Sequence, residues 1–157
     1  MLISGQAERW AYPYRMEIIS DTGTLRCRAE VVASKMEFLL EDLLNKEKWR
    51  CRAERRPGFW GWLIDPFLIL YPETGIPYRF ILRKSGWMRM EVQLGDTIAN
   101  LSLKRRQIVP DLGLELVLDR KKFVATFQKE LPHGVPIQAA VGVLYFVWLR
   151  WAVMSES

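Results

Sequence analysis

Histidine and cysteine are scarce in this chain: its 157 residues include one histidine, His133, and two cysteines, Cys27 and Cys51. A metal centre built on several imidazole or thiolate ligands is therefore excluded, because such sites need three or four of these side chains. We expect no metal and no cofactor. Residues 1–10 also lack a basic stretch followed by an apolar one, so they do not resemble a secretory signal. Unpaired thiols without such a signal are typical of a reducing compartment, and we expect a cytoplasmic protein.

Linkers and low-complexity tracts are absent as well, which predicts a single domain over residues 1–157. Hydrophobic residues make up 50% of the chain and charged residues 26%, an ordinary mixture for a globular domain with a sizeable core. The formal net charge of +5 permits attraction to phosphate groups without requiring it. An anionic phospholipid surface is a better candidate partner than nucleic acid, because no aromatic residues interleave with the basic ones as stacking platforms.

Most of the chain alternates between apolar and polar residues with a period of two. Leu25, Cys27 and Ala29 point one way, for example, while the basic and acidic residues between them point the other way. This period is typical of a strand with one buried face. Similar segments recur from residue 14 to residue 127, separated by turns rich in Gly, Pro and Asp, and residues 36–44 fit either a strand or a short helix. We count about ten or eleven strands, a mainly β chain of antiparallel hairpins.

The last segment differs from everything before it. Only Gln138 and Arg150 interrupt an apolar run from Val135 to Met154, which predicts a helix over about residues 136–154 that is apolar on every face. Such a helix is either enclosed by the strands or dissolved in lipid. If it is enclosed, residues on opposite sides of it, such as Phe146 and Trp148, should both be buried.

Successive hairpins closed by one hydrophobic C-terminal helix resemble the tubby C-terminal domain, a fold shared with the phospholipid scramblases and the plant LURP-one-related proteins. The matching features are hairpin turns such as Asp21-Thr22-Gly23 and the closing helix from Pro136. The resemblance implies a closed antiparallel β-barrel of about 10–12 strands around a central hydrophobic helix. Tubby itself binds phosphoinositides through basic residues on the barrel exterior, but the fold alone assigns no activity.

Three local signals have ordinary structural interpretations that we favour. Asp21-Thr22-Gly23 matches the aspartic-protease tripeptide, yet its residue types are also those of a hairpin turn. Cys27 and Cys51 each lie in a copy of the pentapeptide RCRAE, where the alternation points both inward as small core residues. His133, in a Pro-His-Gly loop, is a turn residue unless a partner orients it as a general base. The aromatic run Phe59-Trp60-Gly61-Trp62 suits a membrane interface or a plug at a barrel end, and we favour the plug.

Short basic clusters are the candidate lipid-binding residues. Two of them are runs of three, and arginines on the polar faces of the two RCRAE strands could add a basic stripe if those strands are neighbours. Basic residues near an anionic leaflet contribute about 1 kcal/mol each to membrane attraction. The candidates are Arg26, Arg28, Arg50, Arg52, Lys104, Arg105, Arg106, Arg120, Lys121 and Lys122.

Three functional hypotheses follow from the sequence. The first is a non-enzymatic, tubby-like barrel that binds anionic phospholipid headgroups at a membrane surface or acts as an intracellular interaction module. The second is a tail-anchored protein whose residues 135–154 span the bilayer, since about 20 residues form a helix of about 30 Å; Arg150 counts against it. The third is an enzyme that uses His133, and we do not favour it because no nucleophile–base pair is recognisable.

Overall fold

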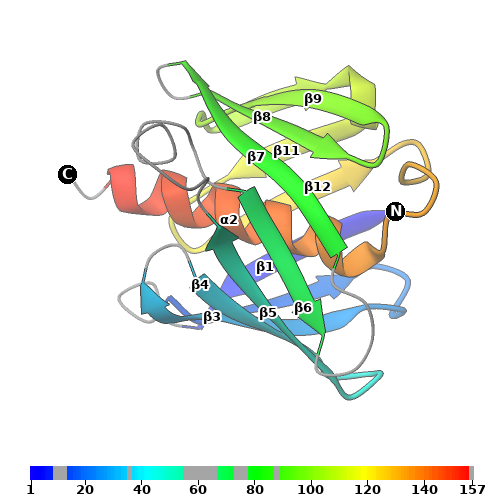
Figure 1. Cartoon of the computed structure of the whole chain (residues 1–157), viewed down its shortest axis with the longest axis vertical. Coiled ribbons are helices and arrows are strands. Elements are labelled where there is room, and N and C mark those ends of the chain that lie inside the picture. Colours follow the sequence, from blue (N-terminus) through cyan, green and yellow to red (C-terminus); the bar gives the residue numbers. More distant parts are fainter. Residues whose placement is uncertain (9–13, 35–36, 55–66, 73–77, 87–88, 156–157) are drawn as a thin grey trace.

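The structure is a computed structural model of the whole chain (Figure 1). The residues that it describes are 1–8, 14–34, 37–54, 67–72, 78–86 and 89–155. Within these ranges only the backbone is described for residues 33–34, 52–54, 67–72, 78–86 and 153–155.

The described residues form one antiparallel sheet of twelve strands, a short 3-10 helix and one long C-terminal helix. The strands are β1 (Leu2–Ala7), β2 (Met16–Ser20), β3 (Arg26–Ser34), β4 (Glu37–Asp42), β5 (Glu47–Glu54), β6 (Phe67–Pro72), β7 (Tyr78–Gly86), β8 (Arg89–Leu94), β9 (Thr97–Ser102), β10 (Arg106–Val109), β11 (Leu114–Leu118) and β12 (Lys122–Phe127). The helices are η1 (Pro110–Leu112) and α2 (Ile137–Ser155).

Each strand pairs with the next in the chain from β1 to β9 and from β10 to β12, and β1 also pairs with β12. The order across the sheet is therefore β10-β11-β12-β1-β2-β3-β4-β5-β6-β7-β8-β9, with β10 and β9 at its two ends. The α-amino group of Met1 donates a hydrogen bond of 2.9 Å to the carbonyl of Phe127, which fixes the start of the chain to the end of β12.

The mainly β, antiparallel class predicted from the alternation is confirmed. In β11 the alternation places Leu114, Leu116 and Leu118 in the core and leaves Glu115 exposed. Of residues 36–44, which fitted two structures, residues 37–42 form the strand β4 and residues 43–44 begin a turn, while residue 36 lies outside the described residues. The structure adds two strands that the alternation did not predict, β1 and β10.

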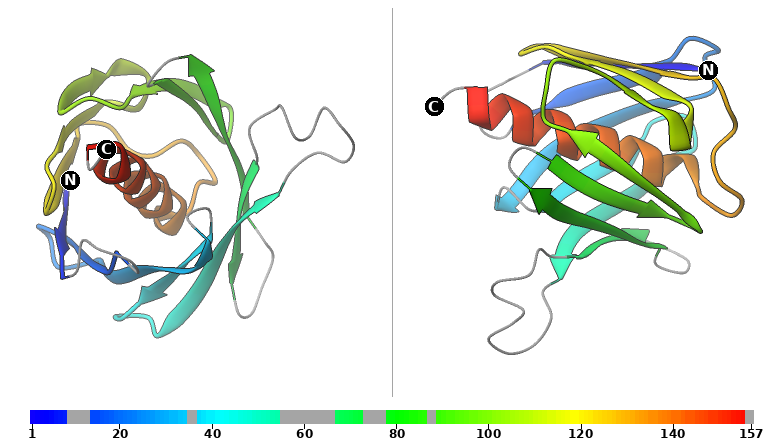
Figure 2. Two further views of the ribbon diagram at one scale, coloured as in Figure 1. Left: turned by 90° about the vertical axis from the view of Figure 1, so that its left-hand side faces the viewer. Right: turned by 90° about the horizontal axis from the view of Figure 1, so that it is seen from above.

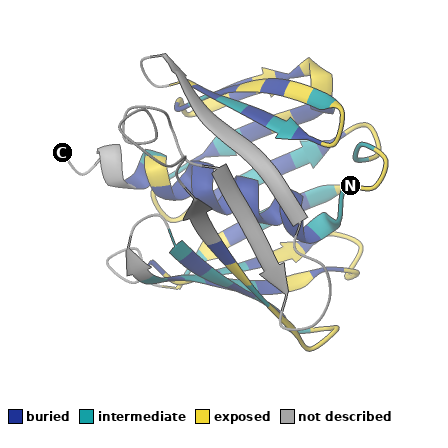
Figure 3. Cartoon of the chain, in the orientation of Figure 1, coloured by how far each residue is buried: buried dark blue, intermediate teal, exposed yellow. Residues whose placement is uncertain are grey.

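The sheet curls around α2, which crosses its interior (Figure 2). Every residue from Gln138 to Leu149 is buried, and the middle of the helix is accordingly dark blue in Figure 3. Phe146 and Trp148 point about 200° apart around the helix axis, and they are 3% and 0% exposed. The prediction that opposite sides of the helix are both buried is therefore confirmed.

Three polar contacts hold α2 in place inside the sheet. The Tyr145 hydroxyl donates a hydrogen bond of 2.7 Å to the carbonyl of Tyr14, and the Trp148 indole N–H donates one of 2.9 Å to the carbonyl of Asp119. The Gln138 side-chain amide donates to the Asp42 carboxylate at 3.3 Å. Each contact joins the helix to the sheet across a long stretch of chain, so the three fix both its depth and its rotation.

Asp42 is 1% exposed and its carboxylate accepts further bonds from its own turn. The backbone N–H groups of Leu44 and Asn45 donate to Oδ1 at 3.1 Å each, and the Asn45 side chain donates to Oδ2 at 3.0 Å. Both carboxylate oxygens are thus satisfied, which is the condition for burying such a group. The end of α2 that carries Gln138 therefore lies at the β4–β5 turn.

The two ends of the sheet, β9 and β10, are consecutive in the chain but form no backbone ladder among the described residues. A side chain joins them instead. The Ser102 backbone N–H donates to Gln107 Oε1 at 2.8 Å, and Gln107 Nε2 donates to the Ser102 carbonyl at 2.5 Å. The expected closure of the sheet into a barrel therefore stays a prediction.

The tail-anchor alternative had residues 135–154 leaving the domain to span a bilayer. In this structure residues 138–149 lie inside the sheet, so that arrangement is not the one observed. None of the described helices has the length and hydropathy needed to cross a membrane.

Candidate anion-binding site

Two of the predicted basic clusters lie on neighbouring turns. Lys104 and Arg105 lie in the turn from β9 into β10, which begins at Arg106, and Arg120 and Lys121 lie in the turn from β11 into β12, which begins at Lys122. The Leu118 backbone N–H donates a hydrogen bond of 2.7 Å to the carbonyl of Arg105, which continues the β10–β11 ladder up to these turns. The antiparallel register thus brings together two basic runs that are separated by more than ten residues in the sequence.

All six of these side chains are exposed. We call them the basic rim: Lys104, Arg105, Arg106, Arg120, Lys121 and Lys122. Among the described residues, no carboxylate lies within 4.0 Å of the charged atoms of Lys104, Arg105, Arg106, Lys121 or Lys122. The rim is therefore a local excess of positive charge that is open to solvent.

The turn that carries the second cluster is fixed to the core. The Asp119 N–H donates to the carbonyl of Lys122 at 2.8 Å, and the Arg120 N–H donates to the Asp119 side chain at 2.7 Å. The Asp119 carbonyl accepts the Trp148 indole N–H described above. The basic rim consequently lies at the end of the sheet where the C-terminal half of α2 emerges.

Arg150 is exposed at the same end of the molecule. It follows Trp148 by two residues, so it points about 200° around the helix from the side that contacts the basic rim. It adds positive charge to this end without joining the rim. The sequence marked it as an interruption of the apolar run, and its exposure explains how a cation is accommodated on this helix.

Three of the other four predicted lipid-binding arginines have carboxylate partners. Arg26 contacts Glu17 at 3.1 Å, Arg28 contacts Glu8 at 3.4 Å, and Arg50 contacts Glu37 at 3.3 Å. A stripe would have required β3 and β5 to be neighbours, but β4 lies between them. The structure therefore leaves Arg26, Arg28 and Arg50 outside the basic rim. The side chain of Arg52 lies outside the described residues.

The opposite end of the sheet, where α2 begins, carries more carboxylates than lysines. Its exposed acidic residues are Asp21, Glu47, Asp96, Asp111 and Glu130, and its exposed lysines are Lys46, Lys48 and Lys129. With the α-amino group of Met1, which lies at the same end, the described charges there nearly balance, so the described residues are electrically asymmetric along the helix axis with the positive end at the basic rim.

The two thiols are poor nucleophiles in the folded chain. Cys27 and Cys51 are both free and fully buried, as the alternation predicted. Burial, helped by the Asp42 carboxylate, raises the pKa of the Cys27 thiol to about 12. Burial and the Glu37 carboxylate also raise the pKa of the Cys51 thiol. Because the thiolate is the reactive form, neither cysteine is suited to nucleophilic chemistry here.

The remaining sequence signals have structural roles or fall outside the described residues. Asp21 to Gly23 form the β2–β3 turn, with Gly23 at φ +74° and the Asp21 side chain accepting the Leu2 N–H at 3.1 Å. His133 is exposed in the loop before α2. Residues 59–62 lie outside the described part of the chain. Within the described residues there is no group of three or more His, Cys, Asp or Glu side chains placed to bind a metal.

Comparison of the chain with protein-family models, with curated proteins and with solved structures finds no match.

Proposed function

We propose that this protein is a non-catalytic binding protein that docks on anionic phospholipid surfaces through the basic rim. The observation that carries the proposal is the gathering of Lys104–Arg106 and Arg120–Lys122 on adjacent turns. Arg26, Arg28 and Arg50 on β3 and β5, by contrast, each contact a carboxylate. Exposed cations gathered in one place are what an anionic surface attracts, and Lys104–Arg106, Lys121 and Lys122 have no carboxylate partner among the described residues.

The charge asymmetry gives the docked protein an orientation. The basic rim would face the headgroups, and the end where α2 begins would point away from them. The axis of α2 would then stand at a steep angle to the membrane, and the helix would stay inside the sheet. Anionic lipids concentrate in the cytoplasmic leaflet, so the proposal places the protein in the cytoplasm at that surface.

The proposal also includes a closed barrel of the tubby-like kind. Its support is the side-chain amide of Gln107 in β10, which accepts a hydrogen bond from the Ser102 N–H of β9 and donates one to the Ser102 carbonyl. These are the two bonds that the backbone of a paired strand would make. A sheet closed in this way gives the two basic turns a fixed spacing. The likeness to the tubby and scramblase folds rests on the pattern of hairpins and the enclosed C-terminal helix.

Vesicle flotation tests the proposal. The protein is mixed with phosphatidylcholine vesicles that contain or lack phosphatidylserine or a phosphoinositide, at low and at physiological salt. We expect the protein to float only with the anionic vesicles, and less of it as salt rises, because salt screens exposed charges. Equal recovery with neutral and anionic vesicles at low salt would refute the lipid proposal.

Two matched variants locate the binding surface. Replacing Lys104, Arg105 and Arg106 with Gln removes three charges from the basic rim. At about 1 kcal/mol for each cation near the surface, the partition coefficient should fall by about 100-fold. The control replaces Lys46, Lys48 and Lys129 at the opposite end with Gln, which changes the net charge equally. If the control weakens binding as much as the rim variant does, the attraction comes from overall charge and not from the rim.

A further inference from the structure

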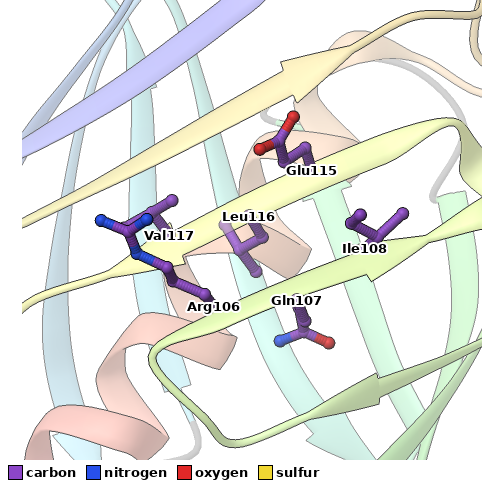
Figure 4. A pocket seen from close by; sticks show the side chains of 6 residues that line it. All are labelled: Arg106, Gln107, Ile108, Glu115, Leu116 and Val117. Carbon is purple, nitrogen blue, oxygen red and sulfur yellow. The ribbon is translucent and has the colours of Figure 1, made fainter.

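The outer face of β10 and β11 carries a shallow hollow of about 420 Å³. Figure 4 shows the six residues that line it. Gln107 and Leu116 belong to the buried face of these strands, so the outer surface is made by four side chains: Arg106 and Ile108 from β10, and Glu115 and Val117 from β11. A second hollow, of about 340 Å³, adjoins the first and shares Ile108 and Glu115 with it.

Ile108 is the most exposed large hydrophobic residue in the described part of the chain, at 75%. So exposed an aliphatic side chain leaves most of its apolar surface in water, and covering that surface is favourable. Its neighbours do not cover it. Directly across the ladder from it lies Glu115, which is also exposed.

The register arranges the four outer side chains as a checkerboard. Arg106 pairs with Val117, and Ile108 pairs with Glu115. The two apolar residues therefore occupy one diagonal, and the cation and the anion occupy the other. A patch of this kind is complementary to itself when it is rotated by 180° about the apolar diagonal.

We propose that the occupant of this face is a second copy of the chain, related to the first by a two-fold axis along the Ile108–Val117 diagonal. Ile108 then packs on Ile108 of the second copy, and Val117 packs on its counterpart. Arg106 of each copy faces Glu115 of the other, which makes two equivalent ion pairs. A two-fold contact uses the same patch on both copies, and such isologous dimers are the commonest oligomers.

The geometry of such a dimer can be worked out from strand dimensions. Residues two apart on a strand are separated by about 6.7 Å and neighbouring strands by about 4.8 Å, so the diagonal lies at about 35° to the strands. Rotation about it crosses the strands of the two copies at about 70°, close to the orthogonal way in which sheets pack. The facing Arg and Glu positions are offset sideways by about 3 Å, which long side chains span.

The association should be weak. Four side chains on each copy bury far less than the roughly 1,200 Å² of total surface that a stable interface needs, even with the adjoining hollow included. The dimer is therefore expected only at high protein concentration. It requires no lipid and goes beyond the membrane docking proposed above, so it is tested in solution without vesicles.

Charge reversal tests the pairing directly by sedimentation equilibrium from about 10 μM to about 1 mM. In the Arg106→Glu variant, the new carboxylate at position 106 of each copy faces Glu115 of the other copy. In the Glu115→Arg variant, the new guanidinium at position 115 of each copy faces Arg106 of the other. Each single variant should associate about tenfold more weakly than the unaltered chain or not at all. A mixture of the two variants should associate again as a heterodimer, and so should the chain that carries both reversals. The control is Arg26→Glu, on a distant face, which should associate as the unaltered chain does.

A thiol cross-link tests the position of the axis. In Ile108→Cys the two new thiols lie opposite each other, so a short bis-maleimide should join two copies efficiently, whereas Ile19→Cys on another exposed face should give little dimer. The native cysteines do not interfere because both are buried. An unaltered chain that stays monomeric at about 1 mM, or a mixture of the two charge variants that does not associate, would overturn the proposal.

Discussion

Removal of residues 136–157 should abolish the fold, because α2 supplies the centre of the core. The truncation removes five large side chains that are at most 3% exposed: Leu144, Tyr145, Phe146, Trp148 and Leu149. Losing one such side chain costs about 2–5 kcal/mol. Five of them together cost about 10–25 kcal/mol, which matches or exceeds the total stability of about 5–15 kcal/mol of a natural domain. The remaining strands would enclose an apolar void and expose their inner faces.

Circular dichroism and urea titration of residues 1–135 measure the effect. We expect no cooperative unfolding transition, and we expect aggregation through the exposed strands. Arg150→Ala in the full chain is the control, because this side chain is exposed and its loss should leave the transition near its original midpoint. A truncated chain that is soluble and unfolds cooperatively would refute the assignment of α2 as the core.

Three further changes probe the interior. A Cβ at Gly5 would lie 2.6 Å from the sulfur of Met16 and against the ring of Phe123. Gly5→Val should therefore lower the unfolding free energy, measured by urea titration, by about 1–3 kcal/mol. An unchanged unfolding midpoint would argue against this packing. The Cys27 thiol, with its pKa raised to about 12, should not react with a thiol reagent at pH 8 until the chain is unfolded. Burial also raises the pKa of Tyr145, so its contribution to stability is full below the phenol's ordinary value of 10.0 and is lost as pH rises above it. The unfolding free energy should fall above about pH 10, and that of the Tyr145→Phe variant should fall less steeply.

The C-terminal helix was predictable because its composition leaves few alternatives. A run from Val135 to Met154 with two polar interruptions must avoid water on every side. The sequence could not decide between lipid and protein as its surroundings. That decision rests on tertiary contacts such as Asp42 to Gln138 and Tyr145 to the Tyr14 carbonyl, which join residues about a hundred or more positions apart.

The two strands that the alternation missed, β1 and β10, both have weak local patterns. In β1 the inward position 5 is a glycine, whose place in the core is filled by the cross-strand ring of Phe123. The strand β10 is four residues long, and its inward position 107 is a glutamine whose side chain hydrogen-bonds the Ser102 backbone in β9. Each strand therefore carries a non-apolar residue where alternation requires an apolar one, and its place in the sheet compensates for that.

The candidate site was predictable in its parts and not in its assembly. Each basic run is visible in the sequence, but the adjacency of Arg105 and Leu118 depends on the β10–β11 register. The carboxylate partners of Arg26, Arg28 and Arg50 depend on the pairing of strands in the same way. Local sequence shows where the charges are, whereas the strand pairing decides which of them are balanced.

The orientation of the protein at a membrane is tested most directly with an environment-sensitive fluorophore on one introduced cysteine. Lys121→Cys places it on the basic rim, and Lys48→Cys places it at the opposite end; the buried native thiols stay unlabelled. On titration with phosphatidylserine-containing vesicles, the label at position 121 should shift its emission toward the blue while the label at position 48 stays unchanged. Equal shifts at both positions, or a shift at position 48 alone, would contradict docking through the basic rim.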